Sequence, residues 1–209
     1  MRAPAAPPLR RATGRPRRLV VDGAAVAAWV KAWCDRSGRR VVARAGDAVA
    51  LASVTGDSVL IPRAEPPAAA CPRVVAALRS LPDDTSVLVD ALDAATHLGG
   101  TLTVLHGVPL SFGERTVGRT EALRHGQELL EQAHALVDGP GAAVAVEIGL
   151  VRVWPHEIVG ELLDADLLVL GGARTGSAGH VGLIVGSALR HAPCAVLLAP
   201  RSPIFRRNE

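Results

Sequence analysis

Short aliphatic runs alternate with amphipathic segments from residue 73 to residue 200, and this alternation restricts the fold more than any other feature of the chain. The aliphatic runs, which read as strands, lie at 73–78, 99–108, 142–151, 166–172 and 194–200. The segments with helical spacing of apolar residues lie at 83–98, 121–137, 155–163 and 185–190. Continuous aliphatic runs are typical of parallel strands that are buried on both faces. The order therefore predicts an α/β fold with an open, mostly parallel five-stranded twisted sheet and helices on both faces.

A shorter unit precedes this domain. Residues 19–64 read as a small αβ unit, too short for a complete doubly wound domain. Residues 65–71 contain two adjacent prolines and several small residues. Such segments usually interrupt helices and strands, so we interpret this one as a linker. We therefore place the main domain at 72–200 and a C-terminal tail at 201–209.

The positive charge of the chain is concentrated in its first 18 residues. The formal net charge is +3, but residues 1–18 alone hold six arginines and no acidic residue. Such a Pro/Ala/Arg segment cannot bury enough apolar surface to fold, so we expect a disordered basic tail. The chain also has only three Trp, two Phe and no Tyr. Single-stranded nucleic acids are usually bound by stacking aromatic side chains, so a nucleic-acid partner is not expected.

Cysteine usage and hydropathy set the expected compartment. Cys34, Cys71 and Cys194 are far apart and show no C-x-x-C spacing, which indicates neither a disulfide framework nor a metal site. No apolar run approaches the roughly 18 residues of a membrane-spanning helix. We therefore expect a cytoplasmic protein with no metal and no membrane partner.

A glycine-rich loop follows the predicted strand at 166–172 and leads to a helix that we expect to begin near Gly186 and Ser187. Glycine amides and a helix N-terminus together favour an anion, because both present unpaired N–H groups. The G-x-x-x-x-G-K-[ST] and G-x-G-x-x-G fingerprints are both absent. Ser187 also lacks the G-x-S-x-G context of a hydrolase nucleophile. The residues alone thus indicate an anion site and no catalytic constellation.

Four stretches in the right order resemble the universal stress protein (UspA-like) family. They are "PRVVAALRSLPDD", "LTVLHGV", "VWPHEIVGELLDADLLVLGG" and "GSAGHVGLIVGSALRHAPCAVLLAP". The last is the most specific, since it includes the H-A-P-C that precedes the final strand. The resemblance covers residues 72–200 and implies an adenine-nucleotide alpha-hydrolase-like fold. It also implies a homodimer that pairs through the last strand.

The N-terminal unit carries a weaker resemblance to the same family. "LVVDGAAVAAW" is similar to the strand and helix that open a stress-protein domain, and "GDAVALASVTGDSVLIPRA" is similar to a later helix and strand. Residues 19–64 are therefore either a degenerate, truncated second copy or an unrelated αβ cap.

Members of the family that bind ATP carry a G-x2-G-x9-G-[ST] motif, whose amides and hydroxyl hold the phosphates and ribose. Gly176 and Gly186-Ser187 fit this motif, whereas Gly172 lies one residue too far from Gly176. The family's nucleoside-binding carboxylate aligns with Arg79, a cation that can only donate hydrogen bonds. The resemblance thus implies one set of nucleotide-site residues: Ala77, Arg79, Gly107, Gly172, Gly176, Gly186 and Ser187.

Three functions remain open at this stage. The preferred one is a non-enzymatic stress-response module with an altered nucleotide site, for which ATP is the candidate ligand and no cofactor is certain. The second is a ligand-free interaction protein that dimerises through its last strand. The third, a weak ATP hydrolase, is disfavoured because no general base is evident.

Overall fold

The computed structural model describes residues 18–23, 26–44, 46, 57–63, 71–108, 116–138, 144–160, 163–174 and 182–201. Residues 1–17 of the expected basic tail, most of the expected linker and most of the C-terminal tail lie outside these residues. Arg18, which was expected to belong to the disordered tail, instead begins a strand and donates a hydrogen bond to Asp57 at 2.8 Å. The strands are β1 (Arg18–Asp22), β2 (Arg40–Arg44), β3 (Ser58–Ile61), β4 (Arg73–Leu78), β5 (Thr101–Gly107), β6 (Val146–Val151), β7 (Leu167–Arg174) and β8 (Ala195–Arg201). The helices are α1 (Ala28–Ser37), α3 (Thr85–Leu98), α4 (Thr116–Val137), α5 (Pro155–Ile158) and α6 (Leu183–His191).

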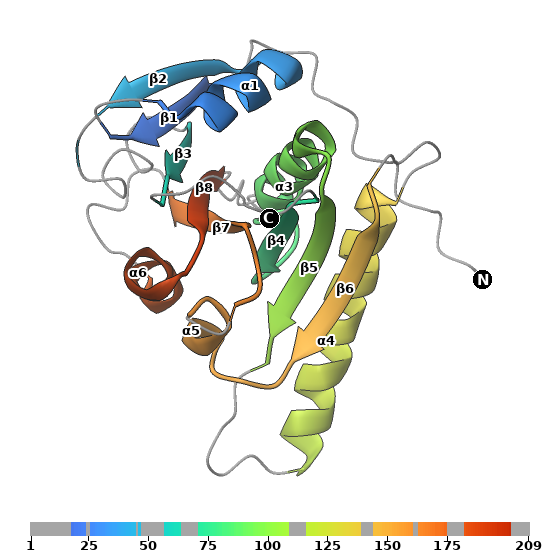
Figure 1. The fold of residues 1–209 in the computed structure, drawn as a ribbon. Helices are drawn as coiled ribbons and strands as arrows, with labels where there is room; N and C mark the ends of the chain where they lie inside the picture. The colour runs from blue at the N-terminus through green and yellow to red at the C-terminus, as the bar shows by residue number, and fades with distance from the viewer. Residues whose placement is uncertain are drawn as a thin grey trace, which may run out of the picture.

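All of these strands belong to one sheet (Figure 1). The strand order is β2-β1-β3-β8-β7-β4-β5-β6, and every neighbouring pair is parallel except β3 and β8. The predicted α/β class and mostly parallel sheet are therefore confirmed. The predicted count of five strands is wrong, because the sheet has eight. The difference arises because the three strands of the N-terminal unit extend the same sheet.

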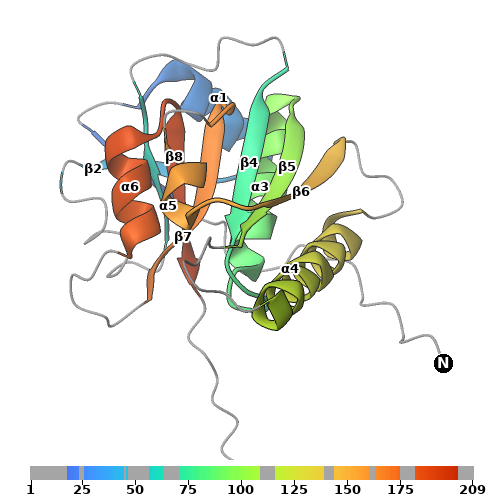
Figure 2. The same ribbon diagram turned by 90° about the horizontal axis from the view of Figure 1, so that it is seen from below.

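Helices cover both faces of the sheet (Figure 2). On one face, α1, α3 and α4 bury a large hydrophobic core that includes Trp33, Leu88 and Leu130. On the other face, α5 and α6 bury a smaller core that includes Val159 and Val185. Strands β7 and β8 are buried on both faces from Leu167 to Leu170 and from Ala195 to Ala199. This two-sided burial explains why their sequences read as uninterrupted aliphatic runs.

The N-terminal unit repeats part of the arrangement of the main domain. Strand β1 lies between its parallel partners β2 and β3, as β4 lies between β5 and β7. Helix α1 crosses from β1 to β2 on the same face on which α3 crosses from β4 to β5. Right-handed crossovers of this kind place each helix over the strands that it connects.

Strand β8 lies inside the sheet. The expected homodimer required a free edge on this strand, but β8 pairs with β7 on one side and with β3 on the other. Val59, Leu60 and Ile61 oppose Leu198, Leu197 and Val196 in the antiparallel ladder. Dimerisation through the edge of the last strand is therefore contradicted, because the chain itself occupies that edge.

A buried ion pair ties the N-terminal unit to α3. Arg39 donates to Asp90 at 2.7 Å and to Asp93 at 2.8 Å, and its side chain is 3% exposed. Its guanidinium carbon lies 5.4 Å from the ring centroid of Trp33, and Ser58 of β3 donates to Asp90 at 2.6 Å. Burial alone would lower the pKa of Arg39, but the charges of Asp90 and Asp93 outweigh it and raise the pKa. Helix α3, strand β3 and the turn before β2 thus meet at one charged cluster.

We expect Arg39→Ala to lower the free energy of unfolding by about 3–5 kcal/mol, because it removes the guanidinium that compensates the buried charge of Asp90. Urea denaturation followed by circular dichroism measures this change. The matched control is Arg40→Ala, since Arg40 is the exposed neighbour and exposed substitutions usually change stability by less than about 0.5 kcal/mol. Equal effects of the two substitutions would contradict the role given to Arg39.

We also expect the chain to be a monomer of 21.6 kDa at micromolar concentration, because β3 occupies the edge of β8. Size-exclusion chromatography with multi-angle light scattering measures the mass directly. A particle of twice this mass would show that another surface joins two chains.

Candidate functional site

Beyond the carboxyl ends of the neighbouring strands β4 and β7, the chain continues to helices on opposite faces of the sheet. The chain leaves β4 toward α3 on one face, and it leaves β7 toward α6 on the opposite face (Figures 1 and 2). In open α/β sheets, ligands bind beyond the strand ends at such a switch point. This edge is therefore the candidate functional site.

Two of the expected site residues lie on neighbouring strands at this edge. Ala77 of β4 is half-buried and lies in register with Leu105 of β5 and Leu170 of β7. Gly107 ends β5 opposite Val151. Between them, His106 forms a hydrogen bond of 3.0 Å from Nδ1 to the Leu78 carbonyl oxygen, which fixes the ring to the end of β4.

Arg79 follows β4 directly and its side chain is exposed. Its backbone N–H donates to the Asp84 carboxylate at 2.7 Å, and the N–H of Ser80 donates to the same oxygen at 3.2 Å. Asp84 is 1% exposed, and its other oxygen accepts from Arg201 at 3.1 Å. Asp84 therefore closes the turn after β4 and binds it to the end of β8, while the guanidinium of Arg79 remains in solvent.

Gly171 is required beside this pair. A Cβ atom at position 171 would lie 2.8 Å from Oδ1 of Asp84 and would clash with the Arg201 guanidinium. Glycine thus lets the Arg201 side chain lie against the backbone of β7. Sequence reasoning missed Asp84 and Arg201 as partners because 117 residues separate them.

The glycine-rich loop is only partly described. Gly172 is buried in β7, whereas Gly176 lies outside the described residues. Helix α6 begins at Leu183 with Gly182 as its N-cap, one turn before the expected start near Gly186. The N–H of Gly186 consequently donates to the Gly182 carbonyl at 3.0 Å, inside the helix. The free amides of this N-terminus therefore belong to residues that precede Gly186.

The hydroxyl of Ser187 faces a neighbouring helix. It donates to the backbone carbonyl of His156 at 3.1 Å and thereby joins α6 to α5. Leu183 occupies the first position of α6 and is 84% exposed. Ala77, Arg79, Gly107 and Gly172 thus gather at the switch point, whereas Gly186 and Ser187 use their polar groups in helix α6 and its packing.

The segment from β6 to α5 carries two stacked aromatic rings. The rings of Trp154 and His156 are stacked with centroids 6.5 Å apart. The N–H of Trp154 donates to the Glu157 carboxylate at 3.0 Å, which anchors the start of α5. Helix α5 spans only Pro155–Ile158, shorter than the expected 155–163, because a turn at Val159 and Gly160 ends it.

The described ranges contain no cluster of three or more His, Cys, Asp or Glu side chains arranged to hold a metal ion. None of their helices is long and apolar enough to cross a lipid bilayer.

The cysteines differ sharply in exposure. Cys34 and Cys194 are buried, and burial raises the pKa of each thiol to about 11. Cys71 is exposed just before β4. Because the thiolate is the reactive form, the buried pair is chemically inert at neutral pH.

We expect one thiol to react rapidly with Ellman's reagent at pH 8 in the native protein, and all three after denaturation. At that pH, a thiol with a pKa of about 11 is ionised to roughly one part in a thousand. Cys71→Ser should abolish the rapid phase. A rapid phase that persists in this variant would show that Cys34 or Cys194 is accessible.

Residues 72–200 match the model of the universal stress protein family. Among solved structures, a putative universal stress protein from Pseudomonas aeruginosa UCBPP-PA14 has 16% identity and a TM-score of 0.51, covering 88% of this chain and 81% of that one. A universal stress protein from Archaeoglobus fulgidus has 21% identity and a TM-score of 0.50, covering 64% of this chain and all of that one. At these identities the likeness shows the fold alone. No curated protein matches the chain.

Proposed function

The chain belongs to the universal stress protein family, and on that premise we propose that it is a non-enzymatic stress-response module of the cytoplasm. We propose further that it binds an anionic nucleotide, with ATP as the candidate, at the switch point between β4 and β7.

The position of Arg79 carries this proposal. Its backbone is held by Asp84 at the end of β4, while its exposed guanidinium forms no ion pair with any residue in the described ranges. A guanidinium can bind a phosphate through two parallel hydrogen bonds. Small residues at Ala77 and Gly107 leave the neighbouring strand ends open to a ligand. Arg79 thus stands where the family has a carboxylate that binds the nucleoside. In this chain, we expect the phosphates of the ligand, and not its nucleoside, to contact this position.

The hydrogen bonds of the polar groups support a non-enzymatic role. Ser187 donates to a backbone carbonyl, and His106 is bonded to another backbone carbonyl. Asp84 is bonded to Arg201 and to two backbone amides. A nucleophile needs a side-chain base within hydrogen-bond reach, and among the described residues Ser187 is hydrogen-bonded to a backbone carbonyl and to no such base.

A second candidate is a ligand-free interaction protein, which Leu183 favours. This side chain is 84% exposed at the first position of α6. An exposed leucine suits contact with another protein better than contact with phosphate.

We expect ATP to raise the melting temperature of the protein, and Arg79→Ala to weaken ATP binding at least tenfold. Loss of one charge-assisted hydrogen bond costs about 1.5–3 kcal/mol, which corresponds to roughly ten- to hundredfold in Kd. Isothermal titration calorimetry measures the Kd for ATP of the parent protein and of the Arg79→Ala variant. Arg73→Ala is the matched control, because Arg73 is an exposed arginine at the opposite end of the same strand.

The outcomes separate the candidates. No nucleotide in the heat-released supernatant and no thermal shift with ATP would favour the ligand-free protein. Tighter binding by Arg79→Asp would show that Arg79 closes the site instead of forming it. Formation of ADP from ATP at a rate proportional to the protein concentration would contradict the non-enzymatic role.

A further inference from the structure

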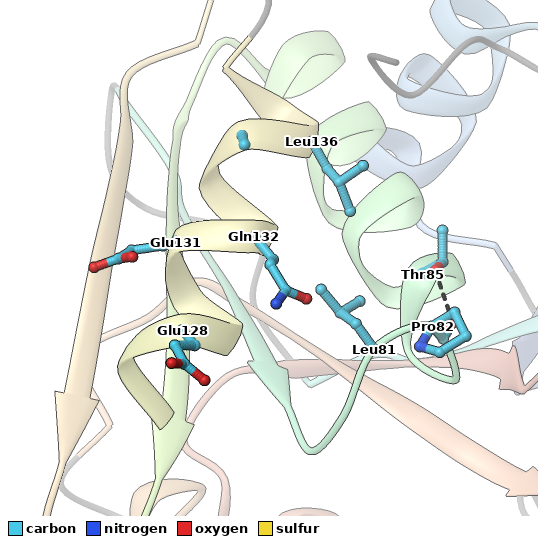
Figure 3. A pocket seen from close by; sticks show the side chains of 8 residues that line it. Leu81, Pro82, Thr85, Glu128, Glu131, Gln132 and Leu136 are labelled. Carbon is cyan, nitrogen blue, oxygen red and sulfur yellow. Dashed lines mark hydrogen bonds between the residues drawn. The ribbon is translucent and has the colours of Figure 1, made fainter. Parts of the chain in front are cut away.

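A second hollow lies between the start of α3 and the middle of α4, lined by other residues than the switch point (Figure 3). Its volume is about 700 Å³, and it is open to solvent. The lining residues come from the turn after β4, the first turn of α3 and one face of α4: Leu81, Pro82, Thr85, Glu128, Glu131, Gln132, Ala135 and Leu136. A hollow of this size accommodates several side chains.

The centre of the hollow is apolar. Leu81 and Leu136 are half-buried, and Figure 3 shows both side chains pointing into the hollow. The hydroxyl of Thr85 donates to the Pro82 carbonyl oxygen at 2.7 Å, so it is already satisfied. Apolar surface that is open to solvent is stabilised when another apolar group covers it. The hollow therefore favours an apolar occupant.

The two carboxylates of the lining do not decide what the hollow binds. Glu128 pairs with Arg124, which lies outside the lining. Glu131 accepts a hydrogen bond of 3.1 Å from the Gln127 amide, and Figure 3 shows its carboxylate pointing away from the hollow. The occupant is therefore selected by its apolar side chains and not by its charge.

The end of β8 is fixed at the first turn of α3, beside the hollow. Arg201 donates to the Asp84 carboxylate at 3.1 Å, and the hydroxyl of Ser86 donates to the carbonyl oxygen of Pro200. Thr85, which lies between Asp84 and Ser86 in the chain, lines the hollow. The chain that follows Arg201 therefore starts at the same helical turn that forms one rim of the hollow.

The sequence after β8 carries an apolar pair at a suitable distance. It continues Ser-Pro-Ile-Phe, so Ile204 and Phe205 follow Arg201 by three and four residues. Ser202 precedes a proline, and such a residue is biased toward an extended backbone. An extended chain spans about 3.3 Å per residue, so Phe205 can lie about 13 Å from Arg201.

This reach is enough to pass the start of α3. The hollow lies on the side of α3 that faces α4, whereas β8 contacts α3 from the other side. An α-helix with its side chains is about 10 Å wide, which is less than the reach of Phe205. The segment 109–115, which also contains a phenylalanine, leads into α4 at Thr116, about 18 Å along the helix from Glu128. The attachment at the end of β8 therefore favours the segment that follows it as the occupant.

We propose that the segment after β8 turns across the start of α3 and docks the side chains of Ile204 and Phe205 in this hollow. The two side chains cover Leu81 and Leu136. The hollow is then a docking site for the chain's own C-terminal segment, and it holds the turn after β4 against α4. The proposal does not depend on nucleotide binding, because no lining residue belongs to the switch point.

The test is fluorine-19 NMR of the full chain labelled with 4-fluorophenylalanine, because the sequence has only two phenylalanines, Phe112 and Phe205. Phe112→Leu assigns the two resonances. We expect the Phe205 resonance of the native protein to be displaced from its position in the urea-denatured chain. Ala135→Arg should return it to that position, because Ala135 is an exposed residue of the lining and an arginine there occupies the hollow.

Gln127→Arg is the matched control. Gln127 is exposed on the same helix and lies outside the lining, so the variant gains the same charge without filling the hollow. The Phe205 resonance should stay displaced in this variant. Thermal melting of both variants shows whether the fold is retained.

Three results would overturn the proposal. The first is a Phe205 resonance that has the same position in the native and denatured protein. The second is a displaced resonance that Ala135→Arg leaves unchanged, or a response to Ala135→Arg that appears at Phe112 in place of Phe205. The third is a displacement that disappears on dilution, since a second copy of the chain would then supply the docked segment.

Discussion

The antiparallel ladder between β3 and β8 is the contact on which the rest of this molecule depends. It joins a block of three parallel strands to a block of five and so makes one continuous sheet. Without it, β8 would present a row of unpaired N–H and C=O groups, which is a template for pairing with another chain. The N-terminal unit thus pairs this strand edge within one chain.

The N-terminal unit also contacts helix α6. Arg63, just after β3, donates to the Leu189 carbonyl at 2.8 Å near the end of α6. A cation at a helix C-terminus is favourable because it meets unpaired carbonyl groups and the negative end of the helix dipole. Together with the Arg39 cluster on the other face, this contact couples the small unit to both helical layers.

At the switch point, the chain keeps the family's framework and changes its chemistry. Asp84 binds the amides of the β4–α3 turn and the Arg201 side chain, so its carboxylate serves the fold. Arg79 presents the exposed charge at the strand end. The proposed binding at this edge would therefore depend on attraction of an anion to a guanidinium, in contrast to hydrogen bonding to a carboxylate.

The sequence by itself determined the local elements and the parallel core. The aliphatic runs predict β4, β5, β7 and β8 closely, because burial on both faces leaves a local signature in each strand. The signature motifs also predict the family and the strand end that carries Ala77, Arg79 and Gly107.

Only the tertiary structure decided which strands meet across long distances. Hydrophobic pattern specifies which face of a strand is buried but not which partner its edge finds, so the position of β3 beside β8 could not be read from the chain. The pairs Asp84–Arg201 and Arg39–Asp90 join residues 117 and 51 positions apart, and no local spacing encodes them. The start of α6 at Leu183 likewise depends on packing: Val185 and Ala188 are buried against the sheet, and this contact extends the helix one turn before the serine that the motif suggested.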